Sequence, residues 1–339
     1  MTRRAVLLAC FLAISVGWTR AASRLPAHLT DKEFWQLSTD SSEQDGYFRS
    51  DNLTSNELLY LHVIPELVTR TKPGEVYLGV GPEQNYTYIA ATKPAMAVIF
   101  DIRRGNLLLQ LMYKAMFELT KTRAEFVSML FSRPRPEGLS NEAGVTELFA
   151  AFGAVDRSDD LYQHNANAIV ERLTKTHGLP LTQPEIAGLR SIYHAFFERG
   201  YAVRYSPTYA DLMTATDRAG VHRSYLASEA AFNVVRDLQT ANLVVPVVGD
   251  FGGPKAIRSV AAYLKAHDAT VGAFYLSNVE QYLTQDGKMT AFCRSVAVLP
   301  LDATSTFIRS MSGRGTPGFG FGFVSSLGPM QYEIRACTP

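Results

Sequence analysis

The segment VYLGVGPEQNYTYIAATKPAMAVIFDIRRGN, residues 76–106, restricts the fold more than any other part of the sequence. It predicts a strand at 76–80, a glycine-containing turn, a helix at 83–92 and a second strand at 96–101. The second strand is continuously apolar over AMAVIF, which is typical of a strand covered on both faces. Two strands joined by a helix within about 30 residues pair in parallel through a right-handed crossover. The segment therefore predicts a parallel sheet.

The same alternation returns near the C-terminus. NLVVPVVGDFGG predicts a buried strand that runs into a glycine turn, and ATVGAFYLS predicts another strand. Pro246 cannot donate a backbone hydrogen bond, so its strand is expected to be bulged or at a sheet edge. The other elements expected here are a helix at 254–267, a strand at 294–299, and a final strand or loop at 318–324.

Between these two blocks the patterns are mainly helical. FSRPRPEG breaks a long helix expected at 106–131, and LTQPEI has the proline of a helix start. Further elements are expected as a polar surface arm at 24–56, helices at 55–69, 141–152, 159–177, 183–199 and 223–240, and a short strand at 202–205. We therefore predict a Rossmann-like, doubly wound α/β fold with a mostly parallel sheet and a large helical insertion. Its parts are 22–131, the insertion 132–240, and 241–339.

Composition limits the kinds of partner. The 339 residues are 47% hydrophobic and carry a formal net charge of +1. A chain of this kind buries a substantial core but has no basic field that would attract nucleic acid. A small-molecule ligand is the expected partner.

The N-terminus resembles an export signal. Arg3 and Arg4 precede the apolar run 5–16, and small residues follow at 19–22. The run is too short for a bilayer span, so we predict a signal peptide at 1–21, for which the twin-arginine type is one option. After cleavage the protein would be periplasmic or secreted and would have no membrane span. Two alternatives stay open: a cytoplasmic domain with an N-terminal anchor, and lipidation at Cys10.

Cleavage would leave two cysteines, Cys293 and Cys337. In an oxidising compartment they can form one disulfide or remain two thiols, and the sequence leaves both possibilities open. No Cys-x-x-Cys or His-x-x-x-His pattern occurs, so no metal site is expected.

The candidate site follows from the predicted sheet. Ligands of open parallel sheets bind beyond the carboxyl ends of the strands, which here are the loops 79–85, 101–106, 249–254 and 277–280. Glycines let the backbone turn tightly beside a ligand, and an acid at the end of the second strand can accept hydrogen bonds from ribose hydroxyls. The expected ligand-binding residues are Gly79, Gly81, Pro82, Asn85, Asp101, Arg103 and Asp250.

Structural readings of the same residues remain open. Asp101 could cap the next helix near Asn106, and Asp250 could bond its own turn. Ser277 and Asn278 could face the ligand or cap a helix. DATSTFIRS, which begins at Asp302, could line the site or begin a helix.

The turn also restricts the class of ligand. A Walker loop is absent, and Gln84 stands where a dinucleotide site has a third small residue, which disfavours NAD and FAD. A turn in which the third glycine is replaced, followed by an acid at the end of the next strand, is more similar to the binding sites for S-adenosylmethionine.

YLGVGPEQNYTYIAATKPAMAVIFDIRR resembles motif I and the following acidic strand end of Rossmann-like class I S-adenosylmethionine-dependent methyltransferases. The resemblance implies that Gly79 and Gly81 approach the methionine part of the cofactor and that Asp101 holds its ribose. Two features depart from the family: Tyr77 replaces an acid, and no Asn/Asp-Pro-Pro-Tyr/Phe motif follows a later strand, where we place GDFGGP instead. No catalytic residue is therefore assigned.

We expect an S-adenosylmethionine-binding protein that acts as a methyltransferase on an acceptor the sequence does not name. The alternative is an exported, non-catalytic protein that binds a small ligand or a partner on a degenerate methyltransferase fold. An exported protein meets little S-adenosylmethionine, which favours that alternative. A dinucleotide oxidoreductase comes third, and the oligomeric state is not predicted.

Overall fold

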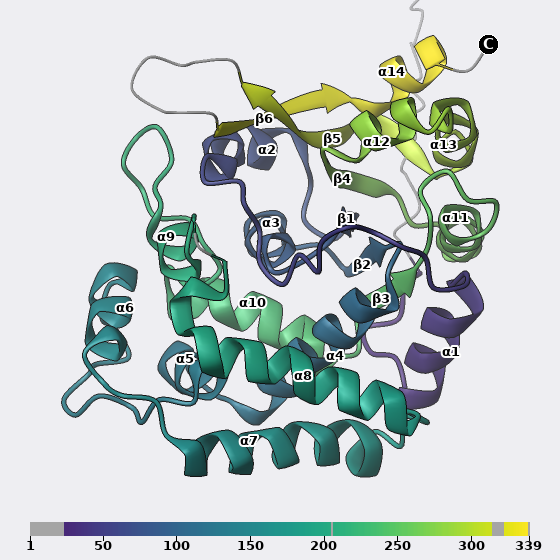
Figure 1. Ribbon diagram of the computed structural model, residues 1–339. Helices are drawn as coiled ribbons and strands as arrows, with labels where there is room; N and C mark the ends of the chain where they lie inside the picture. The colour runs from purple at the N-terminus through teal and green to yellow at the C-terminus, as the bar shows by residue number, and fades with distance from the viewer. Residues whose placement is uncertain (1–23, 205, 314–321, 338–339) are drawn as a thin grey trace, which may run out of the picture.

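A twisted sheet runs through the computed structural model, which describes residues 24–204, 206–313 and 322–337 (Figure 1). Within these residues the strand order is β3-β2-β1-β4-β5-β6. The first five strands are mutually parallel and β6 is antiparallel to β5. The strands are β1 (Val76–Val80), β2 (Met96–Asp101), β3 (Val244–Val248), β4 (Val271–Ser277), β5 (Leu301–Gly313) and β6 (Gly322–Pro329). The predicted Rossmann-like, doubly wound and mostly parallel α/β fold is confirmed.

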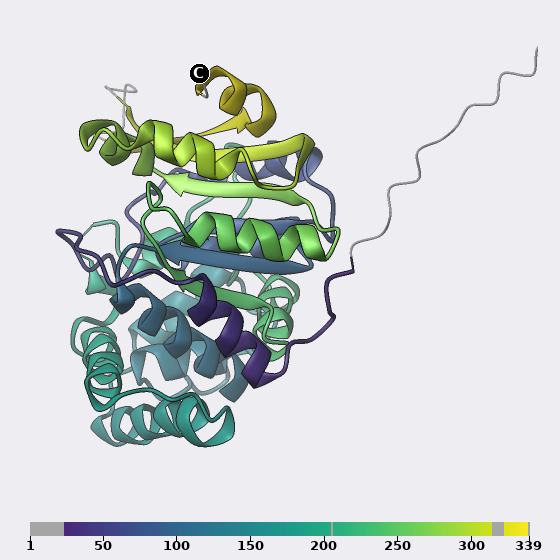
Figure 2. The ribbon, with the colours of Figure 1, turned by 90° about the vertical axis from the view of Figure 1, so that its right-hand side faces the viewer.

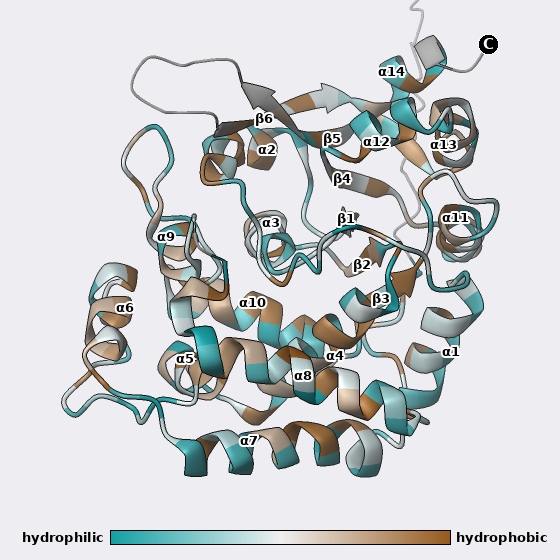
Figure 3. Cartoon of the chain, in the orientation of Figure 1, coloured by the Kyte–Doolittle hydropathy of each residue, from teal (hydrophilic) through white to brown (hydrophobic). Residues whose placement is uncertain are grey.

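Helices cover both faces of the sheet (Figures 1 and 2). One face carries α2 (Ile64–Arg70), α3 (Gln84–Thr92), α4 (Arg104–Leu119) and α10 (Glu229–Thr240). The other carries α1 (Asp31–Ser41), α11 (Ala256–Ala266) and α13 (Met289–Val296). Figure 3 shows hydrophobic residues on β2 and β3, where both faces are covered. All residues of these two strands are buried.

The edge strand β3 explains the position of Pro246. β3 pairs only with β2 among the described strands, so the sheet loses no hydrogen bond through the missing N–H of the proline. The open side is covered by α1, where the Ser38 hydroxyl donates to the Pro246 carbonyl at 2.5 Å. The predicted edge position is confirmed.

Helix α1 itself contradicts the expectation of a surface arm without regular structure at 24–56. Thr30 and Glu33 form a capping box at its N-terminus, and Phe34, Ser38 and Ser41 are buried on its inner side. Only one of these three is apolar, so the pattern in the sequence was weak. Packing against β3 and α11 stabilises the helix.

The segment after β2 forms two helices rather than the single one expected at 106–131. Helix α4 ends at Leu119, and α5 (Arg123–Phe131) begins anew where the Thr122 side chain accepts from the Glu125 amide. The helix expected at 55–69 is shorter, because a 3₁₀ turn, η1 (Tyr60–Val63), precedes α2.

Further helices lie outside α4 on one side of the molecule, away from the sheet (Figure 1). They are α6 (Val145–Gly153), α7 (Asp159–Glu171), the π turn η2 (Arg172–Thr176), α8 (Gln183–Arg199) and α9 (Tyr209–Thr214). The chain returns to the sheet through α10, which packs on α3 and α4. The strand expected at 202–205 is wrong for its described part, because a 3₁₀ turn, η3 (Gly200–Val203), lies there.

Two predictions near the C-terminus are also wrong. The strand expected at 294–299 falls half in the end of α13 and half in the turn after it, and the buried residues Phe292, Cys293 and Val296 of α13 follow helical spacing. DATSTFIRS belongs to β5 and does not begin a helix. Helix α12 (Val279–Gln285) precedes α13, and α14 (Met330–Cys337) packs on β5 and α13. Part of the strand or loop expected at 318–324 lies outside the described residues, and β6 begins at Gly322.

The predictions for the N-terminus, including cleavage after 21 and lipidation at Cys10, lie outside the described residues. Among the described helices, none is long and apolar enough to cross a membrane. Cys293 on α13 is disulfide-bonded. Its pairing with Cys337 stays a prediction, because the Cys337 side chain is outside the described ones.

Candidate functional site

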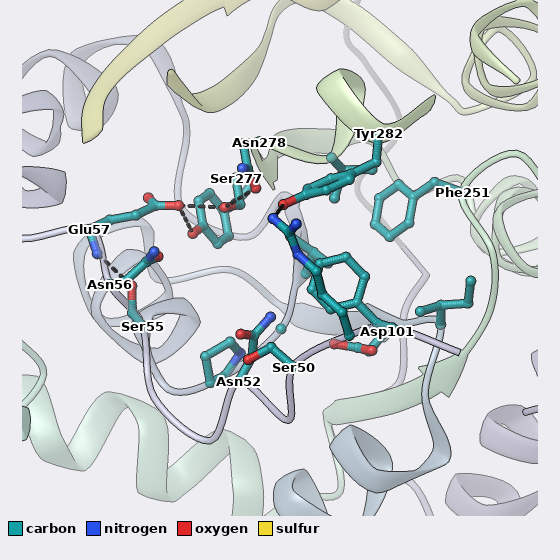
Figure 4. Close-up of a pocket in the computed structure, with 18 of the residues that line it drawn as sticks. Ser50, Asn52, Ser55, Asn56, Glu57, Asp101, Phe251, Ser277, Asn278 and Tyr282 are labelled. Atoms are coloured by element: carbon teal, nitrogen blue, oxygen red, sulfur yellow. Dashed lines mark hydrogen bonds between the residues drawn. The ribbon is translucent and has the colours of Figure 1, made fainter. Parts of the chain in front are cut away.

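A cavity of about 370 Å³ lies at the carboxyl ends of the central strands (Figure 4). Its wall includes the turn after β1, the end of β2, the turn after β3 and the end of β4. The sheet order changes direction between β1 and β4, which is where open α/β sheets bind ligands. The arm formed by residues 47–57 covers one side of the cavity.

Of the expected ligand-binding residues, the structure brings four together in this wall: Gly81, Pro82, Asp101 and Asp250. The other three, Gly79, Asn85 and Arg103, lie behind it. Their contacts show what holds the wall in place.

The turn after β1 is built around Gly81 and Asn85. Gly81 has φ +78°, and open space lies where a Cβ would project, so a ligand could approach its backbone closely. Behind the turn, Asn85 Nδ2 donates to the carbonyls of Val80 at 2.9 Å and Pro82 at 2.7 Å. Asn85 therefore fixes the shape of the turn from inside the protein.

Tyr77 and Gln84, which differ from the methyltransferase motif, are both held by buried hydrogen bonds. Tyr77 donates its hydroxyl to Asn85 Oδ1 at 2.9 Å. Gln84 Nε2 donates to Glu57 Oε2 at 2.9 Å and to the Tyr88 hydroxyl at 3.0 Å. The residue in the third-glycine position is thus anchored in the protein interior, away from the cavity.

Asp101 ends β2 at the cavity wall. Its Oδ1 accepts from the Arg103 amide at 2.9 Å and lies 3.3 Å from Arg103 Nε. Burial raises the pKa of Asp101, and the Arg103 guanidinium opposes that rise. Asp101 does not cap a helix at Asn106. Helix α4 begins earlier, at Arg104, and the Asp101 side chain accepts from the amide of Arg103, the residue before that helix.

Asp250 bonds its own turn and also lines the cavity. Its Oδ1 accepts from the Gly252 amide at 2.9 Å, which is a turn contact, and its Oδ2 accepts from Lys288 Nζ at 2.6 Å. Asp250 and Lys288 both line the cavity. The carboxylate therefore joins the β3 turn to the segment before α13.

The loop opposite the glycine turn follows β4 and not β3. β4 is the neighbour of β1 on the side away from β2, so the loop facing the turn is 277–280 and not GDFGGP. Ser277 and Asn278 line the cavity, and no described side chain caps α12. Glu280 instead forms an ion pair with Arg309 on β5, with Arg309 Nη2 3.0 Å from Oε1.

Glu57, which was not among the expected site residues, is a buried carboxyl group in the cavity wall. Tyr275 donates its hydroxyl to Glu57 Oε1 at 2.9 Å, and Ser277 donates to the same oxygen (Figure 4). Burial raises the pKa of Glu57, and the hydrogen bonds from Ser277, Gln84 and Tyr275 oppose that rise. No motif surrounds Glu57 in the sequence, so only the fold could identify it.

A family model, described as a domain of unknown function (DUF7790), matches residues 53–336. The chain belongs to the DUF7790 family. The matched region includes Glu57, Asp101 and Ser277, so these parts of the cavity wall lie within the DUF7790 domain, whereas α1 precedes it.

No curated protein matches the sequence of this DUF7790 chain. Among solved structures, it is similar to the rRNA methyltransferase aviRa from Streptomyces viridochromogenes, with 11% sequence identity and a TM-score of 0.35. That similarity covers 87% of this chain and 97% of the other. Among the described residues, no group of three or more His, Cys, Asp or Glu side chains could hold a metal ion.

Proposed function

We propose that the cavity binds S-adenosylmethionine and that this protein is a methyltransferase for a small acceptor. The observation that carries the proposal is that the Gly81 turn of β1 and the Asp101 carboxylate of β2 face one cavity at the point where the sheet order changes direction. Adjacent strand ends with these two features suit an adenosyl group.

The residues present fit such a ligand. Asp101 Oδ2 lies 3.5 Å from the nearest Arg103 donor, a long contact that leaves this oxygen able to accept from ribose hydroxyls. Ile102 and Phe251 add apolar surface to the same wall, suited to an adenine ring. A cavity of about 370 Å³ is in the size range of small-molecule sites. When bound, S-adenosylmethionine would supply the methyl group, and the residues named here would hold and orient it.

Glu83 disfavours a dinucleotide. A dinucleotide places its pyrophosphate at the N-terminus of the helix after β1, where free N–H groups attract an anion. Here Glu83 is the N-cap residue of that helix, and its fully buried side chain accepts from the Ser55 amide at 3.1 Å. An acid at this position would repel a pyrophosphate but leaves the uncharged nucleoside of S-adenosylmethionine unaffected.

Photochemical cross-linking of methyl-labelled S-adenosylmethionine to the purified full chain tests the proposal. We expect label on peptides from the cavity wall, loss of label with excess S-adenosylhomocysteine, and little effect of NAD. The variant Asp101→Ala should lose the label, whereas Asp237→Ala should keep it, because Asp237 is an exposed carboxylate on α10. Equal competition by NAD, or full labelling of Asp101→Ala, would refute the proposal.

A further inference from the structure

The end of the cavity at Glu57 contains a carboxyl group for which the described residues supply no paired cation. Glu57 accepts hydrogen bonds from Tyr275, Ser277 and Gln84, and Ser310 also lowers its pKa; all four side chains are neutral. Two of the cations that line the cavity have other partners: Lys288 bonds Asp250, and Arg49 donates to the Tyr282 hydroxyl at 3.2 Å. A third, Arg204, interacts with Glu83. Burial without a paired cation favours the neutral form of Glu57, and a cation that enters this end of the cavity would stabilise its carboxylate.

The hydrogen atoms of the surrounding hydroxyls are already committed. Tyr275 and Ser277 each have one hydroxyl hydrogen, and both donate it to Glu57 Oε1. Their oxygen atoms can therefore only accept from a ligand. Ser277 is the most exposed of the three residues, since Glu57 is 1% and Tyr275 3% exposed. A ligand group here must be a hydrogen-bond donor.

The backbone holds Ser277 in this position at a cost. Ser277 has φ +50°, a left-handed conformation that residues other than glycine rarely adopt. It ends β4, the strand next to β1, and strained residues of this kind cluster at functional sites. The Ser277 side chain lies toward Glu57 at the edge of the cavity (Figure 4).

We propose that Glu57, Tyr275 and Ser277 form a subsite for a primary ammonium group. The ammonium would donate to Ser277 Oγ, and the Glu57 carboxylate behind it would stabilise the charge through the shared hydrogen bond. Glu57 acts here as a positioning residue. Asp101 and Glu57 lie on opposite sides of the cavity (Figure 4). If the proposed function holds, on which this arrangement rests, the Asp101 side would bind the nucleoside and the Glu57 side the ammonium group.

Two sources could supply the ammonium: the amino-acid part of the adenosyl ligand, or an amine acceptor. Calorimetry of the full chain with S-adenosylhomocysteine and with 5′-methylthioadenosine, which lacks the amino-acid part, tests the first source. Glu57→Gln and Ser277→Gly should each lower the affinity for S-adenosylhomocysteine by about tenfold or more, as the loss of a charge-assisted contact does. The affinity for methylthioadenosine should change by no more than about twofold. Ser277→Gly keeps the left-handed backbone without strain, which guards against misfolding. Ser259→Ala, a half-buried serine on α11, is the control.

Crystals of the full chain soaked in ethylammonium chloride test the second source. Ethylammonium should occupy the position beside Ser277 in the wild type and not in Ser277→Gly, and tetramethylammonium, which has no N–H donor, should not bind there. This arm needs no nucleoside, so it decides the subsite even if neither adenosyl compound binds and the proposed function fails. Unchanged S-adenosylhomocysteine affinity in both variants, together with no ethylammonium beside Ser277, would overturn the inference.

Discussion

The side-chain oxygen of Asn85 occupies the space that a Cβ atom on Gly79 would need. Gly79 is therefore required by the packing behind the glycine turn, whereas Gly81, with its positive φ and open surroundings, is required by the conformation of the turn itself. Two glycines that look equivalent in the sequence have different physical roles.

This difference can be measured. Gly79→Ala should lower the free energy of unfolding by about 1–3 kcal/mol, because the new methyl group displaces Asn85 and the turn it holds. Gly105→Ala is the matched control: it lies in α4 with open space around its Cβ, and should raise stability by about 0.5–1 kcal/mol. Urea denaturation gives both values, and equal effects of the two substitutions would contradict this account.

His177 predicts a specific pH dependence of stability. Its Nδ1 and Nε2 each lie 2.6 Å from a carboxylate oxygen, of Asp31 and Glu118 respectively. The hydrogen bond with Glu118 raises the pKa of His177, burial lowers it, and the bond with Asp31 raises it again, with a net rise. A raised histidine pKa gives stability that is complete below its ordinary pKa and is lost as the pH rises through the folded-state pKa.

His177→Gln should therefore be less stable than the wild type by about 1 kcal/mol or more at pH 5.5, and the difference should shrink as the pH rises. Lys114 and Arg172 also face this group, so the comparison is made between variants at each pH. Urea denaturation between pH 5.5 and 9 gives the curve. A difference that grows with pH would mean that the histidine is neutral in the folded protein.

Glu83 predicts the pH dependence expected of a buried acid. Burial raises its pKa to about 7, with hydrogen bonds from the Ser55 amide and its own amide opposing the rise. A raised acid pKa means that stability is complete below the ordinary pKa near 4.5 and is lost as the pH rises through about 7. At pH 8 the ionised carboxylate costs about 3 kcal/mol.

Glu83→Gln removes this ionisation and keeps the acceptor for Ser55. The variant should gain stability over the wild type as the pH rises from 5 to 8, which thermal or urea denaturation can follow. Glu66→Gln, on an exposed position of α2, should show no such trend. A constant difference between wild type and Glu83→Gln across this range would exclude a perturbed Glu83.

The disulfide at Cys293 predicts an altered mass on reduction. With Cys337 as its partner, the denatured protein should take up two more alkyl groups after reduction than before. Peptide mapping should join α13 to the C-terminus, and Cys337→Ser should leave Cys293 open to alkylation. A mass unchanged by reduction would exclude the bond.

The parts of the fold that were predictable have strong local patterns. β1 and β2 have the predicted bounds because each is a short, apolar run between a turn and a helix. Pro246 predicted either a bulge or an edge position for β3, and β3 lies at the edge of the described sheet. Apolar runs of similar length near 294–299 misled the prediction because they suit a buried strand and a buried helix face equally well.

The site was only partly predictable for a different reason. Gly81, Asp101 and Asp250 follow strands, and the parallel order of the strands brings them together. Glu57 stands at the start of the helix expected at 55–69, where nothing in the sequence marks it as a site residue, and its contact with Tyr275 and Ser277 exists only because β4 lies beside β1. Sequence spacing predicted that the loops 249–254 and 277–280 both reach the site, but it carries no information about which of them lies next to the glycine turn.

Calorimetric titration of the purified full chain with S-adenosylhomocysteine tests the proposed function most directly. We predict a dissociation constant of about 1–100 μM, weakening by about tenfold or more in Asp101→Ala and little change in Asp237→Ala, with NAD showing no binding in the same range. No binding of S-adenosylhomocysteine below about 1 mM, or an affinity that Asp101→Ala leaves unchanged, would contradict the account.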